Sequence, residues 1–313
     1  MVDAVPFPDF PGTVGVLAAL IFVISSMLAM GFSLSVREII EPLKNVRLVI
    51  LSLAANFVLT PLLALVLLLV FPLSEGLPIG LFLLGAAAGA PFLPKLAQVA
   101  KGDIAFAVGL MVVTIAYMPI ALPLLLSGVT IDPREIAQSL ILLMLLPLTI
   151  ALLVRARYEE IATGLLPLMN QATNLALLTR IVAFFVVYFT DLVGVIGTTA
   201  IIAAVIFLSV SLVAGYLLGG PGGGTKRVLA VGTAQRNLSA ALAVATLNFT
   251  DPDVMVIILV VGLAGLVLLI FAGGELGKRA KTGDVFLERP AVTLRLWILV
   301  CTGTPADAPL TPQ

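Results

Sequence analysis

The chain has 313 residues, of which 61% are hydrophobic and 11% charged, and its 17 basic residues balance its 17 acidic ones. Soluble domains are about 45–50% apolar and about 25% charged, so this composition excludes a soluble globular protein and indicates an integral membrane protein. The sequence has no histidine, a single cysteine at position 301 and no polybasic run. We therefore expect no enzyme, no metal site and no nucleic-acid partner.

The N-terminal segment, residues 1–13, is predicted to be an extracytoplasmic tail. It contains acidic residues but no Lys or Arg, so the first apolar segment lacks the positive region of a signal peptide and should remain as a helix. A spanning helix needs about 20 apolar residues, and on that length the sequence predicts about nine. Their ranges are Val14–Leu34, Val46–Phe71, Pro78–Ala100, Ile104–Ser127, Ile136–Val154, Leu165–Phe189, Val195–Leu218, Val228–Phe249 and Val254–Gly274.

The loop charges predict the orientation, because Lys and Arg concentrate on the cytoplasmic side of a membrane. Arg134 is the only cation on one side. The cations on the other side are Arg37, Lys44, Arg47, Lys101, Arg155, Arg157, Lys226, Arg227, Lys278, Arg279, Lys281, Arg289 and Arg295. This distribution places the N-terminus outside and the C-terminus in the cytoplasm of a bacterial-type inner or plasma membrane. Residues 275–313 form a cytoplasmic tail, in which TLRLWILVCTG is too short to span.

The third predicted span is broken at membrane depth. Pro91 and Pro94 each remove a backbone N–H, so the helix is expected to unwind near Ala90–Pro94. Lys95 follows at once, and a charge in hydrocarbon persists only where it lines a cavity or meets a partner. The alternative is a kinked structural helix whose lysine extends toward the cytoplasmic side.

The eighth predicted span contains a polar cluster, with Thr233, Gln235, Arg236 and Asn237 inside a segment of Ala, Val and Leu. Polar residues also join transmembrane helices, but an arginine at this depth indicates more than helix packing. We therefore predict a binding site for a substrate or ion at Lys95, Pro94, Asn56, Thr233, Gln235, Arg236 and Asn237.

Arg180, on the sixth predicted span, is a weaker candidate. Its helix also carries Asn174, and the two could form a polar stripe that faces the protein interior. No helix break accompanies them, so a structural tie and a ligand contact remain equally open.

Every Asp and Glu falls in a loop, a terminus or a helix end. The buried cations must therefore be compensated by helix-end carbonyls, by side-chain amides such as those of Asn56 and Asn237, or by an anionic substrate. Helix N-termini at the breaks would favour the same sign of ligand. A small organic anion is thus the expected partner, together with the lipid bilayer.

The third and eighth spans resemble each other in design, and in a layout of nine spans they cross the membrane in opposite directions. Such a pair is the sequence signature of an inverted repeat in a transporter. We predict a first repeat of four spans in residues 14–127 and a second of five spans in residues 134–274.

The sequence resembles the bile acid:sodium symporter family over about Leu28–Gly274. The resemblance is carried by MGFSL at Met30–Leu34, ANFVLTPLLA at Ala55–Ala64, LAQVAKGDIA at Leu96–Ala105 and GTAQRNLSAALAVA at Gly232–Ala245. It implies an all-α membrane protein with an inverted-repeat (4+5) fold, two broken crossing helices, and a core and a panel domain. It also implies alternating access around Lys95 and Arg236.

The chain departs from the family's sodium ligands. The resemblance places Gly232 where sodium-coupled members have a glutamate. It likewise places Leu93, Pro94, Ala107 and Met111 where they have hydroxyl or amide ligands. Only Asn56, Thr233, Gln235 and Asn237 remain as oxygen donors, although hard cations bind through oxygen.

The resulting prediction is a secondary active transporter of a small organic anion, in which Lys95 and Arg236 act as fixed cations near the lost sodium positions, without a cofactor. The alternatives are a sodium symporter with a rearranged ion site and a channel or sensor. A Ser–Lys dyad that uses Lys95 is the one enzymatic arrangement left open.

Overall fold

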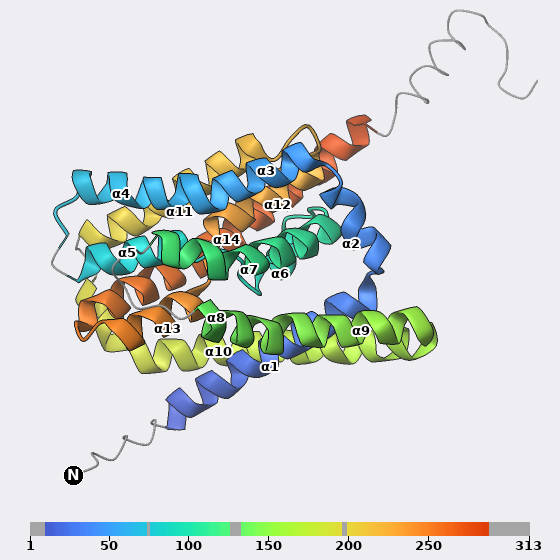
Figure 1. Cartoon of the computed structure of the whole chain (residues 1–313), viewed down its shortest axis with the longest axis horizontal. Coiled ribbons are helices and arrows are strands. Elements are labelled where there is room, and N and C mark those ends of the chain that lie inside the picture. Colours follow the sequence, from blue (N-terminus) through green and yellow to red (C-terminus); the bar gives the residue numbers. More distant parts are fainter. Residues whose placement is uncertain (1–9, 74–75, 126–132, 196–198, 288–313) are drawn as a thin grey trace, which may run out of the picture.

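Helices account for the regular structure in the part of the chain that the computed structural model describes, residues 10–73, 76–125, 133–195 and 199–287. The described residues contain no strand, in agreement with the all-α prediction. They lie in two groups, which Figure 1 shows above and below one another. We call them the core layer and the panel layer.

The panel layer contains the helices at the bottom of Figure 1. They are α1 (Phe10–Ser33), α8 (Pro133–Leu140), the π-helical turn η2 (Ile141–Leu145), α9 (Leu146–Arg157) and α10 (Glu159–Val195). Polar contacts join α1 to both long neighbours. Arg155 Nη1 donates to the Phe32 carbonyl at 2.6 Å, and Thr173 Oγ1 lies 3.0 Å from Ser25 Oγ.

The core layer contains the other long helices and both broken segments. They are α3 (Val46–Ala54), η1 (Ala55–Leu59), α4 (Thr60–Val70), α5 (Leu77–Ala86), α6 (Leu93–Val99), α7 (Ile104–Leu125), α11 (Thr199–Leu218), α12 (Gly223–Ala234), α13 (Leu238–Asn248) and α14 (Pro252–Leu287). Two clusters of buried apolar side chains fill this layer, and the first also includes Met27 and Met30 of α1. The two layers therefore share part of one core.

The connection between the layers is α2 (Val36–Leu43), a short helix that begins with a capping box. The Ser35 N–H donates to Glu38 Oε2 at 2.6 Å, and the Glu38 N–H donates to Ser35 Oγ at 3.3 Å. The backbone hydrogen bond from Ser35, together with its hydroxyl, lowers the pKa of Glu38. The cap fixes where the chain leaves α1 and enters the core layer.

Five described helices are long and apolar enough to cross a membrane: Thr13–Ser33, Val46–Val70, Ile104–Leu125, Thr199–Leu218 and Asp253–Ala280. The predicted spans Pro78–Ala100 and Val228–Phe249 are the broken pairs α5 with α6 and α12 with α13. The predicted spans Ile136–Val154 and Leu165–Phe189 fall in α8 to α9 and within α10. By length and composition, the described residues support an integral membrane protein with several apolar helices.

The first break differs from the prediction in its position. The helix ends at Ala86, the chain is irregular from Ala87 to Phe92, and α6 begins at Leu93. Pro94 therefore lies in the first turn of α6 and not in the unwound stretch. Proline is tolerated there because the first N–H groups of a helix have no intrahelical partner. Gly89, with φ of +76°, makes the turn between the two half-helices.

The chain after Gly274 begins as helix, because α14 continues to Leu287. The remainder of the predicted cytoplasmic tail, including TLRLWILVCTG, lies outside the described residues, as do residues 1–9 of the predicted N-terminal tail.

Candidate functional site

The two breaks lie against each other and are joined through Asn237. Its backbone N–H donates to the Ala87 carbonyl at 2.9 Å, and its Nδ2 donates to the Gly89 carbonyl at 3.2 Å. Its Oδ1 accepts from the Ala240 N–H at 3.2 Å and so caps α13. One asparagine thus satisfies backbone groups of both breaks at membrane depth, where water cannot do so.

Arg236 is buried, with 3% of its surface exposed, and no carboxylate faces it among the described residues. Its guanidinium donates to five oxygen acceptors. Nε donates to the Leu84 carbonyl at 3.1 Å, and Nη2 donates to the Gly85 carbonyl at 2.7 Å. These are carbonyls of the last turn of α5, where the helix dipole is negative and favours a cation.

The remaining N–H groups of Arg236 donate to acceptors in α12 and in the π-helical turn η1. Nη1 donates to Asn56 Oδ1 at 3.1 Å and to the Thr233 carbonyl at 3.2 Å. Nη2 also donates to the Asn56 carbonyl at 3.3 Å. An arginine side chain has five N–H donors, so each of them has an acceptor. The guanidinium joins three elements of the core layer and keeps no N–H for a further ligand.

The acceptor Asn56 is held in place by its own helix. Its Nδ2 donates to the Ser52 carbonyl at 2.9 Å, which orients Oδ1 toward Arg236. Asn56 lies in η1, which precedes Pro61 closely. Proline supplies no N–H, and a wider π turn near it is one local adjustment that leaves carbonyls for other donors.

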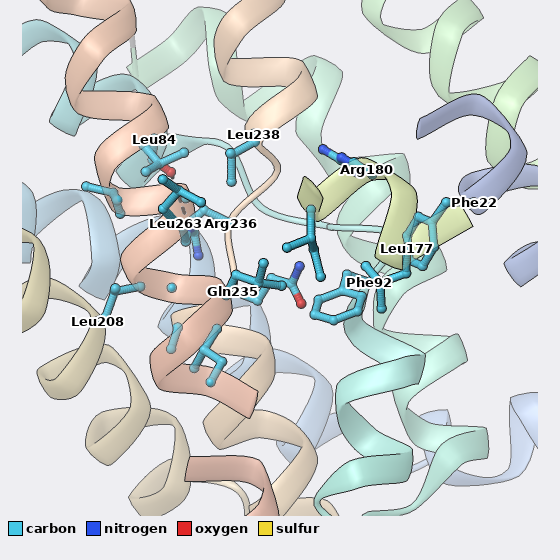
Figure 2. Close-up of a pocket in the computed structure, with 17 residues that line it drawn as sticks. Phe22, Leu84, Phe92, Leu177, Arg180, Leu208, Gln235, Arg236, Leu238 and Leu263 are labelled. Atoms are coloured by element: carbon cyan, nitrogen blue, oxygen red, sulfur yellow. Dashed lines mark hydrogen bonds between the residues drawn. The ribbon is translucent and has the colours of Figure 1, made fainter. Parts of the chain in front are cut away.

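A cavity lies beside the second break, between the core layer and α10. Gln235 and Arg236 contribute to its wall from the break, Arg180 from α10, and Phe22 from α1 (Figure 2). Phe92, in the first break, packs against Phe22 with ring centroids 5.7 Å apart. The remaining lining is apolar, and half of it comes from α14, where Leu238 packs closely on Gly262.

The comparison with known protein families supports this architecture. Residues 20–216 match the model of the Sodium Bile acid symporter family. The chain belongs to the sodium bile acid symporter family. Membership implies a sodium-coupled secondary transporter of organic solutes, and members of this family are transporters and not enzymes. No curated protein matches the chain.

The structure brings together only part of the predicted site. Asn56, Arg236 and Asn237 meet at the breaks, and Gln235, Arg236 and Arg180 line the cavity of this family member. Pro94, Lys95, Asn174 and Thr233 are not among the described residues that line the cavity. Asn174 is exposed on α10, and Thr233 is buried between α12 and α11.

Sequence reasoning did not identify Phe22 or the α14 wall of the cavity. Their segments are rich in Leu, Val, Ile and Ala, as are all the spans, so no single position is conspicuous. The pair Gly262 and Gly265 is the one local signal, because small residues in a spanning helix allow close approach.

Proposed function

We propose that this chain transports a small organic anion by alternating access, with the Arg236 guanidinium in the place of a bound sodium ion. The observation that carries the proposal is the set of five oxygen acceptors around one tethered positive charge. Hard cations are bound by carbonyl and amide oxygens in a similar way. A charge that belongs to the protein would hold the two breaks together in every step of the cycle.

The positions that the resemblance assigns to other sodium ligands are packed with apolar side chains. A Cβ at Gly232 would lie 3.1 Å and 3.3 Å from the two Cδ atoms of Leu93. Leu93, Ala107 and Met111 are buried together in the first apolar cluster. Among the described residues, there is no group of three or more His, Cys, Asp or Glu side chains that could hold a metal ion. These contacts support the loss of the sodium ligands that the resemblance implies.

Lys95 is the second fixed cation of the proposal. It lies in the first turn of α6, directly after the first break, and is half-buried. Within the described part of the chain it has no hydrogen-bond or ion-pair partner. Its role as a fixed charge near the crossing rests on this position.

The proposed architecture is an inverted repeat of nine spans with a core and a panel domain. The succession α5, break, α6, loop, α7 corresponds to α12, break, α13, loop, α14. An aspartate opens the helix after each loop: Asp103 Oδ1 accepts from the Phe106 N–H at 2.9 Å, and Asp251 Oδ1 accepts from the Asp253 N–H at 3.0 Å. The Asp103 N–H also donates to the Gly224 carbonyl at 3.4 Å, which joins one repeat to the other.

In this proposal the N-terminus lies outside and the C-terminus lies in the cytoplasm. The support is the one-sided distribution of loop cations, because positive loops remain on the cytoplasmic side. The predicted repeats, residues 14–127 and 134–274, then have opposite topology.

Sodium-independent uptake is the expected result that tests the function. Purified protein is screened against organic anions by thermal shift, because a ligand that binds the folded state raises its melting temperature. An anion found in this way is then loaded outside proteoliposomes, with an inward sodium gradient or with choline in place of sodium. We expect saturable uptake with the same initial rate in both conditions.

Family membership favours one alternative, a sodium symporter whose ion site is rearranged. Strict dependence of uptake on sodium would select it and reject the proposed role of Arg236. Flux that does not saturate and shows no counterflow would instead indicate a channel.

A further inference from the structure

Two polar groups in the wall of the cavity lack a partner among the described residues. The Gln235 Oε1 atom is buried and accepts no hydrogen bond from the described residues. The Arg180 guanidinium, half-buried on α10, has no hydrogen-bond or ion-pair partner in the described part of the chain. Figure 2 shows the two side chains entering from different elements, Arg180 from α10 and Gln235 from the second break.

The positive charge of Arg180 favours an anionic ligand. A cation beside apolar walls costs free energy unless an opposite charge or several acceptors face it. Arg236 is the other cation at this cavity, and all five of its N–H groups donate to protein oxygens. Arg180 is therefore the group whose planar guanidinium is available to bind a carboxylate or sulfonate by paired hydrogen bonds.

Gln235 would bind a group of the same ligand other than its anionic group. Its Oε1 is an acceptor, and an ionised carboxylate or sulfonate has no hydrogen to donate. Leaving a buried acceptor unpaired is unfavourable, so the matching group on the ligand is a hydroxyl or an amide N–H. The other walls, which include Phe22, Phe92, Leu238 and Leu263, offer hydrocarbon contact.

Building on the proposed transport of organic anions, we propose that Arg180 binds the anionic group of the substrate. Gln235 Oε1 then accepts a hydrogen bond from a hydroxyl or an amide N–H elsewhere on the same substrate. The substrate is then a small monoanion with an apolar body and a hydroxyl or amide hydrogen. The cavity, counted with the solvent-open space at its mouth, encloses about 770 Å³.

Three matched probes test the two contacts separately on purified, full-length protein. The first is 2-hydroxy-4-methylpentanoate, which has both the charge and the hydroxyl. The second is 4-methylpentanoate, which lacks the hydroxyl, and the third is 2-hydroxy-4-methylpentanamide, which lacks the charge. Affinities are obtained from thermal-shift titrations and calorimetry with the wild type, Arg180→Gln, Arg180→Lys and Gln235→Met.

The wild type is expected to bind the hydroxy acid most tightly. Arg180→Gln should weaken binding of the two carboxylates roughly tenfold to hundredfold, because a hydrogen bond to a charged group is lost, and should leave binding of the amide unchanged. Arg180→Lys should retain part of the preference for the acid. Gln235→Met should weaken only the two hydroxyl-bearing probes.

A wild type that binds none of the three probes overturns the inference, and so does an Arg180→Gln variant that binds the acid and the amide as the wild type does. If Arg180→Gln weakens the binding of all three probes equally, Arg180 only maintains the structure of the cavity. If the wild type and Arg180→Gln carry other organic anions equally well, the inference falls while the proposed function stands. If the probes bind as expected but no organic anion crosses the membrane, the proposed function falls while the two contacts stand.

Discussion

Arg236→Met is expected to lower the free energy of unfolding by about 1 to 3 kcal/mol for each buried acceptor that is left unsatisfied. The substitution leaves Asn56 Oδ1 without its donor in a region from which water is excluded. It also removes one donor each from the Leu84 and Gly85 carbonyls, which keep the Ala87 N–H and the Thr60 hydroxyl. The measurement is the melting temperature in detergent. The matched control is Arg157→Met, because Arg157 is exposed at the end of α9 and its replacement should have little effect.

A smaller side chain at position 236 tests directly whether the guanidinium replaces a sodium ion. Arg236→Ala removes the guanidinium and leaves the five oxygen acceptors around an open space, which is a suitable environment for a small hard cation. Sodium chloride should therefore stabilise Arg236→Ala more than choline chloride does, by mass action, while the wild type responds equally to both salts. A wild type that sodium stabilises as strongly as the variant would contradict the proposal that Arg236 replaces the ion.

The second large effect is expected at Gly215, where α11 and α12 approach closely. A Cβ there would overlap the Leu229 carbonyl oxygen and lie 2.7 Å from Thr233 Oγ1. Gly215→Ala should lower the free energy of unfolding by about 1 to 3 kcal/mol, the usual range for overpacking. Because α12 ends just before Arg236, displacement of this helix should also reduce transport.

Gly164→Ala on α10 is the matched control, because a Cβ at this helical glycine meets nothing within 4 Å. It should raise the stability by about 0.5 to 1 kcal/mol, since alanine loses less backbone freedom than glycine in a helix. Equal effects of the two substitutions on the melting temperature would show that the contact of α11 with α12 is not tight.

The sequence predicted the two broken helices because proline, glycine and polar residues interrupt otherwise uniform apolar segments. It also predicted that helix-end carbonyls and Asn56 could compensate a buried cation, and Arg236 donates to both in the structure. The start of the first break was placed too late, because the prolines were expected to lie in the unwound stretch. Pro94 instead lies at the start of α6, where its missing N–H has no cost.

Other features could not be predicted from the sequence. The partners of Arg180 and Gln235 depend on which faces of α1, α10 and α14 meet, and helices made of similar apolar residues do not specify this locally. The π turn at Asn56 depends on a choice between two hydrogen-bond patterns before Pro61, which the sequence leaves open. Tertiary packing decides both.

Asn237 has a mechanical consequence. Because it hydrogen-bonds both Ala87 and Gly89 while Arg236 holds the end of α5, the two half-helix pairs cannot bend independently and form one stiff body. Gln235 belongs to this body, whereas Arg180 belongs to the panel layer. We expect the cavity to open by sliding of one layer past the other, so a bound molecule that spans Arg180 and Gln235 would act as a removable cross-link between them.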